Sequence, residues 1–471
     1  MNTKQYLFAI VIVFASLLTS CDDFLNIKPH GELLPETAAD YETLLNHYDM
    51  LRASETYPIY MTDDAFLPDQ SIGFCGFDYA YPHEQNLYSF SSNLFGDSED
   101  DLLWEEAYRR IYNYNVVIHH ISSASKATEE MKQSLRAEAL LGRAYEYLIL
   151  VNIYAKHYDP KTATADPGIP LILKDDITLE NLTRASVQDV YNSIESDLKE
   201  AVAHLPERPK LNAFRASKPA VLGLLARMYL YNGNYAEALK YANEALAKNN
   251  FLLDYTKYEV VNPNFAMGRI NLPEREKNKE AIYLRSAPNQ NGISGYVYAS
   301  DDLIGIYDKE NDQRFDFSMT NAPYGWADQP APYNSYYLWV LFQFTNVGIT
   351  TPEIYLTAAE CEARVGSKDK AIELINKLRE NRIKGNSALS AATNDEALKL
   401  VLEERRRELA MVGCTRFIDL KRLNLDPRFA KTITRTVNGE TISLPPNDPK
   451  YVLPIPAKVL RFNPDMKPNI R

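Results

Sequence analysis

The chain has 471 residues, and its 63 acidic side chains outnumber 51 basic ones, which gives a formal net charge of −12. This balance argues against nucleic-acid binding, because such binding requires clustered positive charge. Hydrophobic residues make up 45% of the chain, with only 18 glycines and 26 prolines. A collagen-like or disordered chain is therefore excluded, and we expect one globular body with a large core.

An export signal is predicted at the N-terminus. An apolar run from Leu7 to Leu18 follows Lys4. It is shorter than the ~20 residues needed to cross a bilayer but typical of a signal-peptide core. The run ends in Leu18-Thr19-Ser20-Cys21, the pattern of a bacterial lipoprotein cleavage site. We expect residues 1–20 to be removed and Cys21 to carry the lipid, with ordinary secretory cleavage as the alternative.

The three other cysteines, Cys75, Cys361 and Cys414, allow at most one disulfide and show no metal-ligand spacing. Cys361 belongs to an apolar stripe with helical spacing, so we interpret it as a buried thiol. The stripe consists of Ile354, Ala358, Cys361 and Val365.

Helical periodicity covers most of the first half. Thr37 and Asp40 form a capping-box pattern before a helix whose apolar face runs from Tyr41 to Leu51. A second helix is predicted around Trp104 to Ile118, with Trp104 in the core, and a third around Leu141 to Val151. Ser186 and Asp189 provide the cap of a fourth helix, whose inner face extends to Leu205.

A tetratricopeptide-like repeat signal occurs twice. Residues 217–246 carry small and aromatic residues at the offsets of a helix-turn-helix repeat, and residues 354–378 follow the same frame more loosely. A long insertion, roughly residues 251–350, separates the two units, so they are not tandem neighbours in sequence. Within it, residues 281–286 resemble a short strand, and Asn438-Gly439 near the C-terminus predicts a hairpin with a type I′ turn.

Two regions lack helical periodicity and are rich in aromatic residues, namely residues 57–96 and the insertion. We interpret both as long ordered loops, which are uncommon in compact domains and often functional.

Compact catalytic and phosphate-binding motifs are absent. The adjacent acids Asp63/Asp64 and Asp301/Asp302 could serve a glycosidase in principle, but we interpret them as solvated or ligand-contacting residues. Asp63, Asp64 and Asp69 also leave room for a structural Ca²⁺.

Several segments together resemble the SusD/RagB-like family of outer-membrane nutrient-binding lipoproteins of Bacteroidetes. The lipoprotein start at Cys21, a helix motif around Trp104 and a Gly168-Ile-Pro-Leu171 loop are similar to family features. The strongest similarity is Glu404-Arg-Arg-Arg-Glu408, continuing to Arg422, which we interpret as a structural charge network. The chain departs from the family in its C-terminal tail and at Met411-Val412.

The resemblance implies a mainly α fold, a tetratricopeptide-like helix-turn-helix scaffold (α-α superhelix) with long irregular loop insertions and a few short β-hairpins. It also implies a single body over residues 21–471, with helical scaffold at about 37–250 and 351–425 and ligand-facing loops at about 57–96 and 251–350. The implied partner is a SusC-like TonB-dependent transporter, which the protein would cap at the outer-membrane cell surface. No catalysis and no cofactor are implied.

Sugar rings pack their C–H faces on aromatic side chains, and their hydroxyl groups need polar partners. The two loop regions supply both types of residue. We expect the ligand to contact Trp326 first, then Tyr324, Phe74, Tyr79 and Tyr81, with Asp78, Asn86 and Asn291 as polar contacts.

Three classes of function stay open at this point. The favoured one is non-catalytic glycan capture, and a close variant binds peptide, as the RagB-like branch does. A surface glycoside hydrolase would need a carboxylate pair about 5–9.5 Å apart. A pure tetratricopeptide adaptor would have no use for two long aromatic loops.

Overall fold

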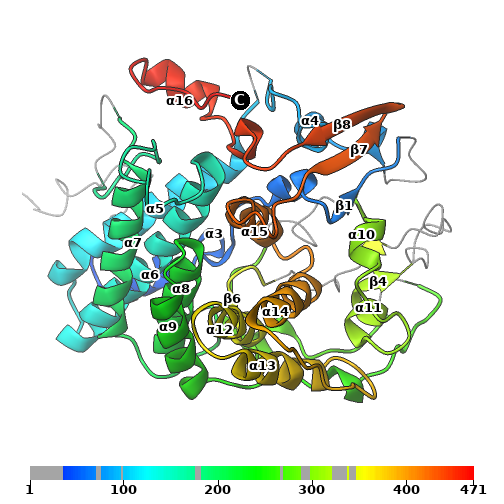
Figure 1. Cartoon of the computed structure of the whole chain (residues 1–471). Helices are drawn as coiled ribbons and strands as arrows, with labels where there is room; N and C mark the ends of the chain where they lie inside the picture. Colours follow the sequence, from blue (N-terminus) through cyan, green and yellow to red (C-terminus); the bar gives the residue numbers. More distant parts are fainter. Residues whose placement is uncertain are drawn as a thin grey trace, which may run out of the picture.

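A computed structural model describes residues 35–69, 76–96, 99–175, 182–265, 269–287, 297–320, 337–338 and 346–471. The fold is mainly α, with helices stacked side by side and the strands confined to short pieces (Figure 1). The expected fold class is confirmed: a tetratricopeptide-like helical scaffold carries long irregular insertions and one clear β-hairpin.

The elements named below have the following bounds. The longer helices are α2 (Ala38–Leu45), α5 (Leu102–His120), α6 (Glu129–Tyr154), α7 (Val187–Val202), α8 (Lys218–Tyr231), α9 (Tyr235–Lys248), α12 (Thr351–Val365), α13 (Lys368–Glu380), α14 (Asn394–Glu408) and α15 (Thr415–Leu423). The short helices are α3 (Tyr48–Leu51), α4 (Pro82–Tyr88), α10 (Asp301–Ile304), α11 (Gln313–Ser318) and α16 (Ala457–Phe462), with 3₁₀ helices η2 (Tyr57–Met61), η3 (Phe77–Tyr79), η4 (Ile121–Ser123), η5 (Tyr255–Lys257), η6 (Arg275–Lys277) and η8 (Pro449–Tyr451). The strands are β1 (Ala65–Phe66), β2 (Ala281–Tyr283), β3 (Tyr298–Ala299), β4 (Met319–Thr320), β5 (Tyr337–Leu338), β6 (Ile349–Thr350), β7 (Ile433–Val437) and β8 (Glu440–Leu444).

Both predicted helix-turn-helix units are present, as the pairs α8–α9 and α12–α13. Although the insertion separates them in sequence, α12 packs against both α8 and α9, so the two units are neighbours in space (Figure 1). Within the insertion, β2 pairs antiparallel with β6 at its end, with Ala281 opposite Thr350 and Tyr283 opposite Ile349.

The predicted helix caps are confirmed. The Thr37 hydroxyl accepts a hydrogen bond from the Asp40 amide, and the Asp40 carboxylate accepts from the Thr37 amide, while Ser186 accepts from Asp189. The first predicted helix is wrong in length, however. It ends at Leu45, and the short α3 follows after His47, whose ring accepts from the Asp49 amide and starts a new turn.

Helix α12 lies between two hydrophobic clusters. One face, with Ile354 and Cys361, joins the main core, and another, with Leu356 and Ala359, packs against α13 and α14. The expected burial of Cys361 is therefore confirmed. Val365, the last member of the predicted stripe, is 55% exposed because it ends the helix where the packing stops.

Two further strand predictions can be compared with the structure. The predicted strand at 281–286 is present as the shorter β2, and the C-terminal hairpin β7–β8 turns at Asn438 and Gly439. Both turn residues have positive φ, 52° and 80°, as a type I′ turn requires. The described helices include none that is both long and apolar enough to cross a membrane.

Helix α6 tolerates no side chain at Gly142, because a Cβ there would lie 2.2 Å from Tyr114 Cζ on α5. We expect Gly142→Ala to lower the free energy of unfolding by about 1–3 kcal/mol, since either helix must shift to relieve the overlap. Chemical denaturation measures this loss. Gly96→Ala is the control, because no atom of the described residues beyond its chain neighbours lies within 4 Å of the added carbon, and an equal loss in both variants would contradict the argument.

Candidate functional site

The two irregular regions meet in one small antiparallel sheet. Its strand order is β1-β3-β5-β4, so β1, from the N-terminal loop region, pairs with β3 of the insertion. The Ser300 hydroxyl donates to the Asp63 carbonyl at 2.6 Å and reinforces this junction. We call this sheet, together with η3 and α4, the loop face; its labelled parts lie apart from the scaffold helices α5–α9 in Figure 1.

Two of the predicted aromatic residues lie exposed on the loop face. Tyr79 is 47% exposed and Tyr81 is 54% exposed, and Asp78, within η3, is exposed as well. The segment is held in place by a hydrogen bond from the Phe77 amide to the Pro68 carbonyl. Exposed rings on an ordered turn have the chemistry that packing against a sugar requires.

A ladder of stacked rings supports Tyr81 from behind. Its ring stacks on His83 with centroids 5.9 Å apart and planes 5° from parallel. His83 in turn stacks on Phe95 at 5.8 Å and meets the edge of Tyr57 at 5.3 Å. The His83 ring also contacts Glu99, with Nδ1 2.7 Å from Oε1. Tyr81 therefore occupies a defined position on the surface.

The ladder ends in a buried hydrogen-bond network. Asp101, which caps α5, accepts hydrogen bonds from the hydroxyl groups of Tyr57 and Tyr154. Burial raises the pKa of Asp101, although these hydrogen bonds counteract the effect. The exposed ring of Tyr81 is thus connected, contact by contact, to the core helices α5 and α6.

Arg435 on β7 is a positioning residue that sequence reasoning missed. Its guanidinium donates to the carbonyl oxygens of Tyr60 and Tyr88, at 2.6 and 2.8 Å, and to that of Thr62. It also lies 4.1 Å from the centroid of the Tyr88 ring. No local pattern could reveal this role, because the contacted residues lie 347 to 375 positions away in the chain.

Residues 57–96 were expected to form loops without helices, and this expectation is wrong in part. The described portion contains η2, η3 and the seven-residue helix α4. Helix α4 begins at Pro82, and the Glu84 carboxylate accepts a hydrogen bond from the Tyr81 amide. The proline and this acidic cap stabilise the start of a helix whose apolar residues show little helical periodicity.

The expectation that Asp63 and Asp64 are solvated or contact ligand is also wrong. Both are buried in ion pairs: Asp63 with Arg416 at 2.8 Å and Asp64 with Arg406 at 2.7 Å. Burial alone would raise the pKa of Asp63, but Arg416, Arg406 and Lys431 outweigh it and lower that pKa well below its usual value. Asp302, 56% exposed, pairs with Lys431 and Arg406.

The three acidic residues that were candidate Ca²⁺ ligands bind other groups in the structure. Asp63 and Asp64 face arginines, and the Asp69 carboxylate accepts the amides of Asn438 and Gly439 at 2.8 and 3.3 Å. Within the described part of the chain, no group of three or more histidine, cysteine or acidic side chains could hold a metal ion.

The remaining predicted contacts divide into two groups. Asn86 lies on α4 and its amide donates to the Leu94 carbonyl at 2.9 Å, which orders the turn after the helix. Trp326, Tyr324, Phe74 and Asn291 lie outside the described residues, as do Cys21, Cys75 and Trp339. By chain connectivity, Tyr324 and Trp326 fall between β4 and β5, two neighbouring strands of the loop face.

Comparison with known proteins identifies the family. A family model described as "Starch-binding associating with outer membrane" matches residues 23–230, and a model described as "SusD family" matches residues 349–470. The chain belongs to the SusD/RagB-like family.

Relatives support this assignment along the whole SusD-like chain. Two SusD-like proteins of Formosa agariphila are 24% and 23% identical to it, each match covering 98% of this chain and 97% of the relative. Among solved structures, a SusD superfamily protein from Bacteroides thetaiotaomicron has a TM-score of 0.71 at 19% identity, covering 92% of this chain and all of the other. A laminarin-binding SusD-like protein has a TM-score of 0.63 at 19% identity, covering 92% and 99%.

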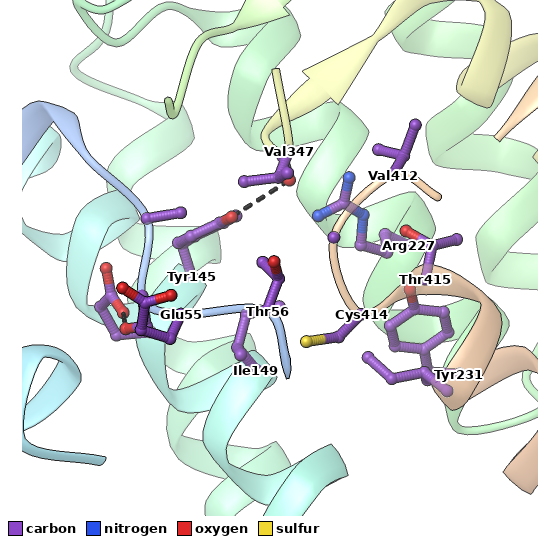
Figure 2. A pocket seen from close by; sticks show the side chains of 15 residues that line it. Glu55, Thr56, Tyr145, Ile149, Arg227, Tyr231, Val347, Val412, Cys414 and Thr415 are labelled. Atoms are coloured by element: carbon purple, nitrogen blue, oxygen red, sulfur yellow. Dashed lines mark hydrogen bonds between the residues drawn. The ribbon is translucent and has the colours of Figure 1, made fainter. Parts of the chain in front are cut away.

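The SusD-like body also contains a small cavity. Its volume is about 20 Å³, room for about one water molecule, so it is too small for a sugar. Figure 2 shows Glu55 on one side of it and Arg227 with Tyr231 on the other, and the Tyr145 hydroxyl donates to the Val347 carbonyl at 3.1 Å. Burial raises the pKa of Glu55 to about 7, and the nearby Glu106 carboxylate adds to this effect.

Glu55 should therefore make stability depend on pH. The folded protein keeps the proton at pH values where the unfolded chain has lost it, so this contribution is complete below about pH 4.5 and disappears as the pH rises through about 7. Between pH 5 and pH 8, we expect the free energy of unfolding of the unmodified protein to fall by about 2 kcal/mol more than that of the Glu55→Gln variant. Chemical denaturation at several pH values measures this, with the exposed Glu310→Gln as control. Parallel curves for all three proteins would contradict the assignment.

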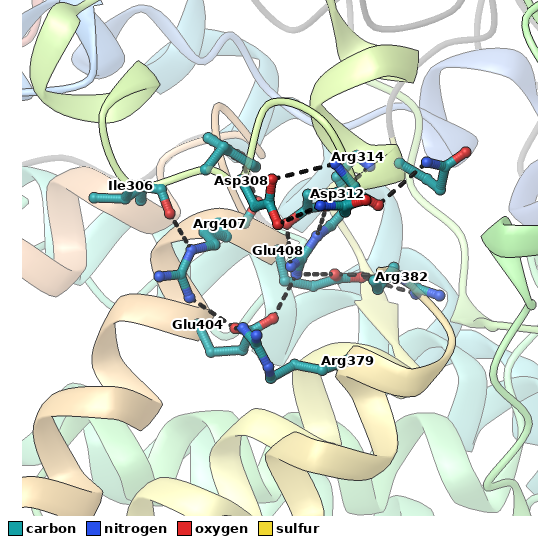
Figure 3. A network of polar contacts seen from close by, with 12 residues as sticks. Ile306, Asp308, Asp312, Arg314, Arg379, Arg382, Glu404, Arg407 and Glu408 are labelled. Atoms are coloured by element: carbon teal, nitrogen blue, oxygen red, sulfur yellow. Dashed lines mark hydrogen bonds and ion pairs between the residues drawn. The ribbon is translucent and has the colours of Figure 1, made fainter. Parts of the chain in front are cut away.

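A buried network of arginines and carboxylates joins the insertion to the scaffold (Figure 3). Glu404 on α14, with a fully buried side chain, forms ion pairs with Arg314 of α11, Arg379 of α13 and Arg407, at 2.8, 2.9 and 2.8 Å. Glu408 pairs with Arg314 and with Arg382, both at 2.9 Å.

The same network reaches two further parts of the insertion. Arg382 reaches Glu280, next to β2, at 2.7 Å, and the Arg407 guanidinium donates to the Ile306 carbonyl after α10. Burial would raise the pKa of Glu408, but Arg382 and Arg314 outweigh burial and lower it. The predicted structural role of the Glu404–Glu408 segment is confirmed, because these side chains hold helices together.

We expect Glu404→Gln to lower the free energy of unfolding by about 3–5 kcal/mol, because it leaves three buried or half-buried arginines with one neutral partner. Its neighbour Glu403 provides the control: it is 37% exposed and, among the described residues, pairs only with Arg407, so Glu403→Gln should cost less than about 1 kcal/mol. Chemical denaturation of both variants tests the difference. Similar losses would show that the network is not what stabilises this junction.

Proposed function

We propose that this protein is a non-catalytic, cell-surface glycan-binding lipoprotein. In this proposal it captures an oligosaccharide or polysaccharide on the loop face and delivers it to a SusC-like TonB-dependent transporter of the outer membrane. The family itself is one of carbohydrate-binding proteins associated with the outer membrane. One relative of the same fold binds laminarin, which supports a glycan as the ligand.

The observation that carries the proposal is the convergence of the two aromatic loop regions. The β1–β3 pairing joins them, and the stacked ladder behind Tyr81 presents a ring to solvent. A fixed ring costs little conformational entropy when it packs against a sugar. Asp78, Tyr79 and Tyr81, together with Trp326, Tyr324, Phe74, Asn86 and Asn291, are the proposed ligand contacts.

The proposed anchor follows from the N-terminal sequence. Removal of residues 1–20 and lipidation of Cys21 would attach the body to the outer membrane through acyl chains. The acidic residues Asp22 and Asp23 follow this cysteine directly.

The deciding experiment is isothermal titration of the purified protein against plant, host and microbial glycans and a peptide digest, with product analysis of each positive. We expect saturable binding without shortened products. Trp326→Ala should abolish binding at the loop face, and Tyr81→Ala should weaken it about fivefold or more, because each stacked ring contributes about 1 kcal/mol.

The control is Tyr112→Ala, which removes a tyrosine that is 36% exposed on α5, away from the loop face. Shortened sugars in the product analysis would refute the non-catalytic role. Binding of peptides alone would indicate that the ligand is a peptide and not a glycan, as in the RagB-like branch.

A further inference from the structure

A second concave site lies on the scaffold, away from the loop face. It is a cleft of about 470 Å³, within the size range of small-molecule sites. Its walls come from the connection between α7 and α8, from the end of α9 and the residues after it, and from the segment that leads into β2. In Figure 1, α8 and α9 lie well separated from α4 and the hairpin β7–β8.

Charge distinguishes this cleft from the rest of the chain. The whole chain carries −12, yet the cleft is lined by four cationic and two acidic side chains. One acid, Glu207, is already neutralised, because Lys248 and Lys218 bind it at 2.6 and 2.8 Å. Arg208 and Lys279 are exposed and form no ion pair with any described residue. These two cations are therefore available to an anionic ligand.

The amide groups of the cleft add hydrogen-bond donors rather than acceptors. The side-chain oxygens of Asn212, Asn249 and Asn278 each accept a backbone amide of their own loop, at 3.1, 3.2 and 3.0 Å. The Asn249 Nδ2 donates to the Lys279 carbonyl at 3.1 Å, whereas those of Asn212 and Asn278 donate to no described residue. The side-chain amide groups that remain for a ligand are thus N–H donors, whereas the exposed Glu276 is the one carboxylate of the lining without the two lysine partners that Glu207 has.

An aromatic ring completes the site. Phe251 lines the cleft and is 38% exposed, and the Lys279 ammonium lies 5.8 Å from its ring centroid. A ligand that satisfies all these groups must carry negative charge, many oxygen acceptors and an apolar face. An acidic saccharide, with uronate or sulfate groups on sugar rings, combines the three properties.

We propose that this cleft is a second saccharide-binding site that takes acidic sugars. Arg208 and Lys279 bind the carboxylate or sulfate groups, the Nδ2 atoms of Asn212 and Asn278 donate to ring or hydroxyl oxygens, and Phe251 packs against a sugar face. This site is independent of the loop face, so either can fail without the other.

The test is isothermal titration of the purified protein with an oligogalacturonate and a sulfated disaccharide, and with maltotetraose as the neutral probe. We expect the acidic sugars to bind and maltotetraose not to occupy the cleft. The double variant Arg208→Ala/Lys279→Ala should weaken acidic-sugar binding at least tenfold, since two charge-assisted contacts are lost. Binding should also weaken as the salt concentration rises from about 0.05 to 0.5 M.

Matched variants locate the binding. Lys399→Ala, which removes an exposed lysine of α14 outside the cleft, should change nothing. Phe251→Ala should weaken the acidic sugars but leave binding of a polyglutamate peptide unchanged. The changed side chains are exposed or half-buried, and thermal unfolding verifies that each variant folds.

Three results would overturn the inference. The first is no binding of either acidic sugar at low salt. The second is loss of acidic-sugar binding in Trp326→Ala but not in the double variant, which would assign these sugars to the loop face and leave the proposed function intact. The third is equal binding of polyglutamate and sugars, both insensitive to Phe251→Ala, which would indicate a surface that attracts anions without recognising saccharides.

Discussion

The pairing of buried arginines with carboxylates around α14 is the interaction on which the rest of the structure depends. A charge removed from water costs several kcal/mol unless it meets an opposite charge and hydrogen bonds, so each buried arginine is confined to one geometry. Glu404 and Glu408 each accept arginines from different parts of the chain, including Arg314 of the insertion and Arg382 after α13. One helix turn therefore fixes where the insertion sits against the scaffold.

That constraint explains how an insertion of about 100 residues can interrupt two repeats without separating them. The pairing of β2 with β6 closes most of it into a loop, and Arg227 of α8 binds both Glu353 of α12 and the Gly348 carbonyl at this closure. Because loop-closure entropy grows only slowly with length, a closed base allows a long insertion at small cost. The scaffold stays continuous, and the insertion can carry aromatic residues to the loop face.

The sequence allowed the local features to be predicted, but not the long-range ones. Helix caps at Thr37 and Ser186, the turn at Asn438-Gly439 and the burial of Cys361 depend on neighbours within a few residues, and all are confirmed. The family resemblance supplied the fold class. The burial of Asp63 and the contacts of Arg435 join residues more than 340 positions apart, and no local pattern encodes such partners. Trp326, the first predicted contact, remains a prediction.

Contacts with residues both near and far in the sequence also hold Tyr81 in place on the loop face. Tyr81 stands on a surface turn, yet its ring is backed by His83, then by Phe95 and Tyr57, and finally by the carboxylate of Asp101 at the start of α5. A tyrosine on an unsupported loop would have to be ordered when ligand arrives, and that cost would be subtracted from affinity. Here the ordering is completed during folding. If Tyr81 contacts the ligand as proposed, the buried polar network at the base of the ladder contributes to binding without touching the ligand, because it removes the entropic cost of ordering that ring.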